Sequence, residues 1–504
     1  MDFLDPKKER WDRITLLVGY VLVSLAIAIG AFWLLFLSYG WTKDRQGNVV
    51  QNGLLFVSSQ PSGAAIFLDG QRYQSDTNSR VITPAGTYTL QITKQGYRIW
   101  QRKVTVLGDD VQHFDYPFMW PQKLKTTSLA DLTTDPSMAT QSPDHRWLLL
   151  GKSDDAGTFT MYDFKHPDKP VSTDIKLPAG SFTPGIGAQA WSAVEWAADN
   201  KHVLLQHTYA TASGTAREYV LLDRSAPVSS VNLTTSLNLG AAETVSLYDN
   251  RVAQLYVYNA NTLTLRRMSA TDGTVASTLE HVLAYKTYAD NKILYVTDKS
   301  PTGKAVDGQV SAVLQEGQET ITLRTLPAAG TGTYLLNLAE YAGDWYVGVG
   351  ATNGTAVYVY KNPQSDTGTG ADTYPDPWRR LPISNPSYLS FSDNTQFLMA
   401  ESGQQFVTYD LENLAEYRYT IPQPLDQPQL HATWMDGDRL LYVSGGKLVV
   451  FDYDSKNRQT LVPANASYLP FFAPDYTYLY TARPDSSDGS VKPGLDSTPL
   501  TLKQ

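Results

Sequence analysis

The hydrophobic pattern of the chain begins with one long apolar segment. No charged side chain occurs between Arg13 and Lys43, and Leu, Ile, Val and Phe occur all around the helix that residues 14–41 would form. A helix that is apolar on every side suits lipid better than a protein surface, and about 20 such residues span a bilayer core. We therefore predict a transmembrane helix at residues 14–41.

The charges that flank this segment predict its orientation. Four basic residues lie within residues 7–13, whereas Lys43 and Arg45 follow the helix beside Asp44. Basic flanks stay in the cytoplasm, so we expect a cell-membrane protein with residues 1–13 inside and the rest of the chain outside. A cleaved signal peptide is the alternative, because Ala26-Ile27-Ala28 loosely matches a cleavage site, but the apolar cores of signal peptides are shorter, about 7–15 residues.

After the helix the pattern changes to short strands separated by turns. Within residues 50–110, Tyr88, Leu90 and Ile92 alternate with polar residues, which is the period of a half-buried strand. Asp69-Gly70 is a hairpin turn sequence, because glycine tolerates a positive φ. Several such strands in so short a segment predict a small β-sandwich.

This segment resembles the PEGA domain, a small all-β module common on bacterial surface proteins. Ser62 stands where the family's eponymous tetrad has Glu. The resemblance implies a binding or spacer role at a bacterial cell surface and brings no catalytic residues. The matching features are the strand Leu54–Ser59, Pro61-Ser62-Gly63-Ala64, Leu68-Asp69-Gly70, Gly86-Thr87-Tyr88 and Gly96-Tyr97.

A degenerate repeat occupies residues 121–504. Each copy has a short strand, a polar turn that often contains Asp, an aliphatic strand, a second turn and a strand rich in aromatic residues. A period of about 48 residues is that of a four-stranded propeller blade. The copies lie at residues 142–164, 196–223, 245–268, 288–298, 336–361, 390–411, 433–454 and 472–482.

The repeat resembles the TolB-like and WD40-like propellers, whose blades begin with a Ser-Pro-Asp-Gly type of turn. Ser142-Pro143-Asp144 and Ala473-Pro474-Asp475 match that turn best. We expect a mainly β chain with an eight-bladed propeller, seven blades being the alternative. The last copy lacks a fourth strand, and we expect residues 123–132 to supply it. Residues 114–121 are interpreted as an apolar hinge that packs the sandwich onto the propeller.

Composition and motifs exclude several kinds of chemistry. The chain of 504 residues has no Cys and a formal charge of −9, so it has no disulfide or thiolate site and no basic face for nucleic acid. No histidine pair has metal-ligand spacing; His202 and His207 should face opposite sides of one strand. Nucleophile-elbow and phosphate-loop motifs are absent from the sequence. We therefore predict no catalytic, cofactor-binding or metal-binding residue.

Three pairs of aspartates could offer oxygen ligands to calcium, which needs several oxygens around a tight turn, but no pair matches the twelve-residue calcium-loop pattern. We interpret them as solvated turn residues. The pairs are Asp154-Asp155, Asp436 with Asp438, and Asp485 with Asp488.

Two hypotheses for the function follow. The first is a non-enzymatic, membrane-anchored scaffold of the bacterial cell surface, which contacts a protein or a cell-wall polymer through the PEGA-like and propeller domains. The alternative is an extracellular propeller-based lyase or glycosidase that acts on cell-surface polysaccharide. An enzyme of this kind would need acidic side chains that converge at the central channel of the propeller.

Overall fold

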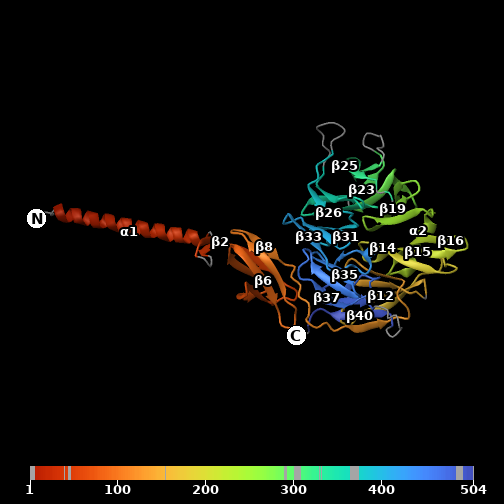
Figure 1. The fold of residues 1–504 in the computed structure, drawn as a ribbon, viewed down its shortest axis with the longest axis horizontal. Helices are drawn as coiled ribbons and strands as arrows, with labels where there is room; N and C mark the ends of the chain where they lie inside the picture. Colours follow the sequence, from red (N-terminus) through yellow and green to blue (C-terminus); the bar gives the residue numbers. More distant parts are fainter. Residues whose placement is uncertain are drawn as a thin grey trace. The chain divides into compact units, whose positions relative to one another are not determined.

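The computed structural model describes residues 6–38, 40–43, 47–153, 155–288, 292–299, 308–328, 330, 332–363, 374–483 and 492–502. The chain divides into two compact units, Met1–Lys123 and Leu124–Gln504. The first contains one long helix and a small β-sandwich, and the second contains the repeated strands (Figure 1).

Helix α1 (Pro6–Ser38) contains the apolar segment. Its part Arg13–Phe36, 24 residues, is long and apolar enough to cross a membrane, and none of it is buried within the protein. The helix begins before the expected position 14 and ends before position 41. The early end has a local cause: Gly40 has a φ of +65°, and β1 (Trp41–Lys43) pairs with the next strand instead of continuing the helix.

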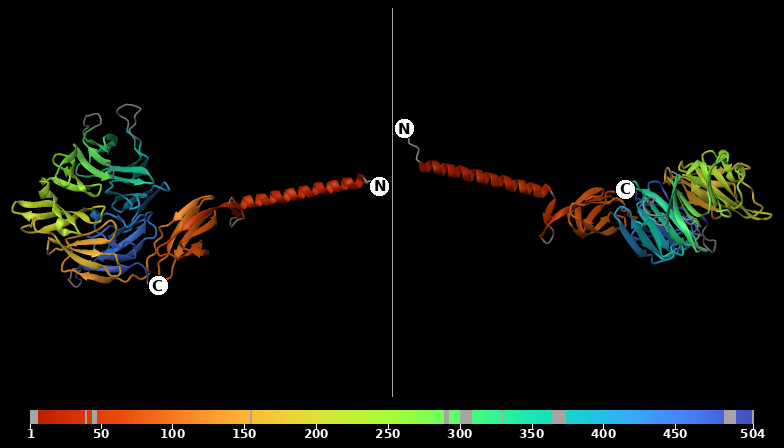
Figure 2. Two further views of the ribbon diagram at one scale, coloured as in Figure 1. Left: turned by 180° about the vertical axis from the view of Figure 1, so that it is seen from behind. Right: turned by 90° about the horizontal axis from the view of Figure 1, so that it is seen from above.

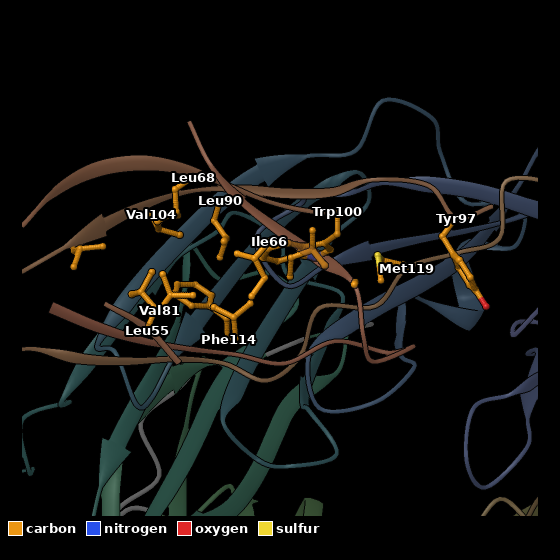
Figure 3. Close-up of a cluster of buried hydrophobic side chains, with 14 residues drawn as sticks. Leu55, Ile66, Leu68, Val81, Leu90, Tyr97, Trp100, Val104, Phe114 and Met119 are labelled. Atoms are coloured by element: carbon orange, nitrogen blue, oxygen red, sulfur yellow. The ribbon is translucent and has the colours of Figure 1, made fainter. Parts of the chain in front are cut away.

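The sandwich consists of two sheets. In the first, β2 (Val49–Val57) pairs with β1 and β5 (Ser79–Pro84) in antiparallel fashion and with β8 (Val111–Phe114) in parallel. The second sheet has the order β4 (Gln71–Asp76), β3 (Ala65–Leu68), β6 (Gly86–Thr93), β7 (Trp100–Val106). The two sheets enclose a core that includes Leu55, Ile66, Val81, Leu90, Trp100 and Phe114 (Figure 3).

The period-two pattern of β6 is confirmed. Leu90 and Ile92 are fully buried, whereas Thr87 and Thr89 are exposed. Tyr88 is only half-buried, because its hydroxyl reaches the rim of the sandwich and donates a hydrogen bond to the Pro84 carbonyl at 2.8 Å. The core face of this strand is therefore the predicted one.

This register yields a first testable prediction. Leu90→Ala should lower the free energy of unfolding of the sandwich by about 2–5 kcal/mol, because it empties a fully buried site. Thr89→Ala, one residue away on the exposed face, should cost less than about 0.5 kcal/mol. Urea unfolding of the two variants measures both values, and equal losses would contradict the register.

The interpretation of residues 114–121 as a hinge is wrong. Phe114 and Met119 belong to the core of the sandwich itself, and Phe118 and Trp120 are also buried. Backbone hydrogen bonds join Gln60 N–H to the Pro117 carbonyl at 2.9 Å and Arg98 N–H to the Trp120 carbonyl at 2.7 Å. The aromatic density indicated burial correctly, but it could not show which body buries these rings. The sandwich therefore extends beyond residue 110.

The second unit contains eight four-stranded antiparallel sheets among its described residues, numbered here as sheets 1 to 8 in chain order (Figure 2). The strands of sheets 1 to 4 are β10 (Met138–Gln141), β11 (Trp147–Gly151), β12 (Thr158–Asp163) and β13 (Val171–Lys176); β14 (Gln189–Trp196), β15 (His202–Thr211), β16 (Gly214–Asp223) and β17 (Val231–Asn232); β18 (Glu243–Tyr248), β19 (Arg251–Asn259), β20 (Thr264–Ser269) and β21 (Val275–Leu279); and β22 (Val282–Tyr288), β23 (Lys292–Thr297), β24 (Gln309–Glu316) and β25 (Glu319–Pro327).

The strands of sheets 5 to 7 are β26 (Tyr334–Tyr341), β27 (Asp344–Ala351), β28 (Ala356–Lys361) and β29 (Arg379–Pro382); β30 (Tyr388–Phe391), β31 (Phe397–Ser402), β32 (Gln405–Asp410) and β33 (Ala415–Thr420); and β34 (Thr433–Trp434), β35 (Arg439–Ser444), β36 (Lys447–Asp452) and β37 (Gln459–Pro463). Three short helices lie in the connections, η1 (Pro227–Ser229), α2 (Leu233–Ser236) and η2 (Pro428–Leu430).

Sheet 8 is assembled from both ends of the unit. Its strands β38 (Phe471–Phe472), β39 (Tyr478–Ala482) and β40 (Gly494–Pro499) are completed by β9 (Thr127–Asp131), which pairs with β40. The prediction that residues 123–132 supply the missing strand of the last copy is thus confirmed. Arg483 reinforces the junction through bonds to Asp131 at 2.9 Å and Asp496 at 2.6 Å.

Buried side chains join successive sheets and also join the last sheet to the first. The clearest contact of the last kind is Phe164 of sheet 1 stacked on Tyr480 of sheet 8, with ring centroids 4.0 Å apart and planes inclined by 2°. Between sheets 7 and 8, the Tyr476 hydroxyl donates to the Met435 carbonyl at 3.2 Å. The first strands of neighbouring sheets contact one another, as β22 contacts β26 and β26 contacts β30. This arrangement is propeller-like.

The turn between the first two strands of a sheet explains why aspartate recurs in the repeat. The Asp or Asn side chain of the turn accepts a hydrogen bond from the backbone N–H two residues later, at 2.8–3.1 Å, which is an Asx turn. The residue after this side chain often has a positive φ, a conformation that favours glycine. The accepting residues are Asp144, Asp199, Asn394, Asp436 and Asp475, and the positive-φ residues include His145, Asn200, Thr395 and Tyr476.

Candidate functional site

A cavity of about 890 Å³ lies among the first strands of sheets 2 to 6. Residues of β14, β18, β22, β26 and β30 line it, together with residues that follow β14, β18 and β30. Because the first strands of successive sheets contact one another, a cavity between them occupies the position of a propeller's central channel. Concave sites with a few convergent polar groups are the usual places for ligands.

Glu195 is a half-buried acid of this cavity. One of its carboxylate oxygens accepts a hydrogen bond from the Leu247 N–H of the neighbouring sheet. Burial raises the pKa of Glu195, and the hydrogen bond from Leu247 and the charge of Lys286 offset this rise only in part. A β-bulge between Ala193 and Glu195 in the pairing of β14 with β15 shifts the local register. Bulges re-aim side chains and are frequent beside functional sites.

The other polar groups of the cavity carry both signs of charge. Lys286 is exposed in the cavity, and Asp249 pairs with Arg251 at 3.2 Å. The Tyr285 hydroxyl lies 3.3 Å from the Ser246 hydroxyl, and burial raises the pKa of Tyr285. A lining of hydroxyl, amide, carboxylate and ammonium groups suits a polar ligand with many hydrogen-bonding groups rather than an apolar one.

A second group of titratable side chains gathers in the corresponding turns of sheets 1, 6 and 7. Asp393 is open to solvent but crowded by neighbouring turns, and desolvation together with the charge of Asp436 raises its pKa to about 6. Burial raises the pKa of Asp438 to about 7 against the opposing effect of Arg439. Burial also lowers the pKa of His145, whose ring lies near Tyr476 with centroids 5.4 Å apart.

The aspartates singled out in the sequence meet the expectation of solvated turn residues only in part. Asp436 is not a solvated turn residue: its side chain is 12 % exposed and forms an ion pair with the buried Arg439 at 2.5 Å. Asp155 accepts hydrogen bonds from Gly157 N–H at 3.2 Å and from the Thr158 hydroxyl at 2.7 Å, and so shapes its own turn. Asp154, Asp485 and Asp488 lie outside the described residues.

The two histidines of β15 have separate partners, as their predicted opposite faces require. His202 Nδ1 lies 2.6 Å from Asp199, whereas the fully buried His207 lies 2.9 Å from Glu218. Within the described part of the chain, no group of three His, Cys, Asp or Glu side chains could hold a metal ion.

Sequence reasoning missed Glu195, Asp393 and His145, and it recognised Asp436 and Asp438 only as a local pair. These residues share one feature, their position. Glu195 lies near the end of the first strand of sheet 2, and each of the others lies in the turn that follows the first strand of its sheet. Alignment of the repeat copies by that turn would have identified them as candidates for the channel.

Comparison with known proteins supports the module assignment in the first unit. Residues 52–121 match the PEGA domain family. The match covers β2 to β8 and includes the segment 114–121 that completes the sandwich. No curated protein sequence matches the chain.

Solved structures are similar to this chain only at low identity and low TM-score. Hsv2 of Kluyveromyces lactis is 11% identical over 65% of this chain and 98% of its own, with a TM-score of 0.38. An oligogalacturonate lyase in complex with manganese is 12% identical over 75% and 96%, with a TM-score of 0.37. Apo AztD of Citrobacter koseri is 12% identical over 81% and 96%, with a TM-score of 0.36. The fold assignment therefore rests on the sheet order and packing of this chain.

Proposed function

We propose that this chain is a single-pass membrane protein of a bacterial cell, anchored by α1 with its N-terminus in the cytoplasm. In this proposal the PEGA-like sandwich and an eight-bladed propeller, one blade for each of sheets 1 to 8, lie outside the cytoplasm. The more basic N-terminal flank of the helix supports this orientation.

We further infer that the protein is a non-enzymatic binding protein that contacts a cell-wall polymer through its propeller. The cavity of about 890 Å³ carries this proposal, because its volume is that of a ligand site and its lining is rich in hydroxyl and charged groups. Such a lining matches a saccharide chain, which offers many hydroxyl groups and few apolar surfaces. A protein partner that inserts a polar loop is the other ligand of this kind.

Binding of soluble cell-wall saccharide fragments to the full chain in detergent tests the proposal. Glu195→Gln should weaken binding about tenfold, because a hydrogen bond to a charged group is worth about 1.5–3 kcal/mol. Glu319→Gln makes the same change on the exposed outer strand of sheet 4 and should leave binding unchanged. Calorimetry measures both. Equal affinities of the two variants would place the ligand elsewhere.

An enzyme acting on cell-surface polysaccharide is the alternative, and one observation favours it. Asp393 and Asp438 have pKa values raised to about 6 and about 7. Carboxyl groups that titrate near neutral pH are suited to general acid–base catalysis. Release of new chain ends from the saccharide by the native protein, and its loss in Asp393→Asn, would favour the enzyme over the binding protein.

A further inference from the structure

Three exposed apolar side chains surround the point at which α1 joins the sandwich. Trp41 is 43 % exposed, Val49 47 % and Leu107 59 %. We propose that these three residues form a contact surface for the headgroup region of the bilayer, so that the sandwich rests on the membrane instead of standing away from it. This inference depends on the proposed function in taking α1 as the anchor.

The connection between helix and sandwich is too short to hold the sandwich away from the bilayer. Helix α1 ends at Ser38, and Trp41 already pairs with Gln51 of β2. Three residues span at most about 10 Å. The headgroup layer on each side of the hydrocarbon core is itself about 5–8 Å thick. The end of the sheet that carries Trp41 therefore lies at the headgroups.

Leu107 is fixed beside this entry point by the backbone of β2. Asn52 donates a hydrogen bond to the Gly40 carbonyl at 2.8 Å, and its own carbonyl accepts one from Asp109 at 3.0 Å. A Cβ atom at Gly53 would lie 2.4 Å from the Leu107 carbonyl oxygen, so the turn packs directly onto the strand. Asn52 is therefore hydrogen-bonded both to the turn that presents Leu107 and to Gly40, which lies between the helix and the sandwich.

The chemistry of the surface suits the interface. Trp41 lies 6.2 Å from Phe36 of the helix between ring centroids, and Phe36 lies 6.0 Å from Trp33. Trp side chains favour the headgroup level of a bilayer. Val49 and Leu107 add exposed apolar area, and burial among lipids removes this area from water.

The natural chain has no Cys, so a single engineered cysteine can carry a fluorescent label. Leu107→Cys and Ile99→Cys form a matched pair: the positions are 59 % and 55 % exposed and flank the two ends of β7 (Trp100–Val106). Along an extended strand they are separated by about 27 Å. A third variant, Ser24→Cys, places the label in α1.

Each labelled full-length variant is reconstituted into vesicles of phosphatidylcholine and phosphatidylglycerol that contain a spin-labelled lipid. We expect headgroup-labelled lipid to quench position 107 severalfold more strongly than position 99, and acyl-chain-labelled lipid to quench position 24. Equal, weak quenching at 107 and 99 with strong quenching at 24 would overturn the contact and leave the anchor intact. Absence of quenching at 24 would overturn the anchor, and the contact with it.

Discussion

Disruption of β9 should destabilise the whole second unit, although the strand is short and lies at the start of that unit. Proline at both Leu129 and Ala130 is the proposed change, made in the full chain. Ala130 pairs with Leu495 of β40, and Leu129 lies at the register shift beside it, so the two prolines remove both backbone N–H groups at the centre of the β9–β40 pairing. Sheet 8 would then lose its outer strand and the junction between the two ends of the unit.

The expected loss follows from the ladder. β9 and β40 pair through Thr127, Ser128, Ala130 and Asp131, and each net backbone hydrogen bond contributes about 0.5–1.5 kcal/mol. A total of roughly 2–5 kcal/mol lowers the melting temperature of a unit of this size by roughly 2–6 °C, because the entropy of unfolding grows with the number of residues. The exposed edge of β40 should also promote aggregation. Thermal unfolding and light scattering measure the two effects.

A double glycine variant at Leu129 and Ala130 is the matched control. It removes the same side chains but keeps both N–H groups, so it should lose less stability than the proline variant and stay soluble. If the two variants melt together, side-chain packing and not the ladder closes the unit. If neither differs from the natural chain, β9 contributes nothing to sheet 8.

Glu218→Ala should be the most destabilising single substitution among the polar residues of sheet 2. Glu218 is 2 % exposed, and its carboxylate lies 2.9 Å from His207 Nδ1, which is itself fully buried. Thr183 N–H donates to it at 2.6 Å and the Asn232 amide at 2.7 Å. Removal of a buried carboxylate leaves each of its hydrogen-bonding partners unsatisfied at a cost of about 1–3 kcal/mol, so the loss of several such partners at once should be large. Denaturant unfolding measures this loss.

The pH dependence of stability provides an independent check. Burial alone would raise the pKa of Glu218, but the hydrogen bonds from His207, Thr183 and Asn232 outweigh it and lower the pKa. A carboxyl whose pKa is lower in the folded protein stabilises the fold above its ordinary pKa of about 4.3, and this contribution is lost as the pH falls. Glu218→Gln should therefore flatten the loss of stability below that pH. An unchanged acid profile would contradict an ionised Glu218 in the folded protein.

An alanine substitution in an exposed ion pair is the control for Glu218→Ala. Arg72 and Asp76 form an ion pair at 3.2 Å with side chains 62 % and 46 % exposed. Because solvent screens such a pair, Asp76→Ala should cost at most about 1 kcal/mol. Comparable losses for Asp76 and Glu218 would mean that His207 does not depend on its carboxylate partner.

The sequence predicted the elements of this protein more successfully than its contacts. The alternation of Tyr88, Leu90 and Ile92 identified the core face of β6, because strand periodicity depends only on neighbouring positions. The aromatic run from Phe114 to Trp120 indicated buried residues, but it was interpreted as a hinge between the two domains, whereas Phe114 and Met119 belong to the core of the sandwich. Burial can be recognised from side-chain chemistry, whereas the packing partner depends on β8 lying parallel to β2, a pairing between residues distant in the chain.

In the candidate site, too, the sequence predicted the local features but not those that depend on contacts between sheets. The Asx turns of the repeat were visible as recurring aspartates, and the incomplete last copy indicated that residues 123–132 close sheet 8. Glu195 was not visible as a site residue, because its place in the cavity depends on the β-bulge of β14 and on Leu247 of the next sheet. Asp393 and Asp438 have raised pKa values only because several turns meet around them.

By itself, then, the sequence determined the apolar helix, the PEGA-like module, the repeat and its closing strand, since each of these depends on local composition, periodicity or the count of strands along the chain. The tertiary structure alone decided that Phe114 and Met119 complete the sandwich and that Glu195 lines a central cavity. These outcomes depend on which distant segments meet, and therefore on burial and charge environments that no short stretch of sequence contains.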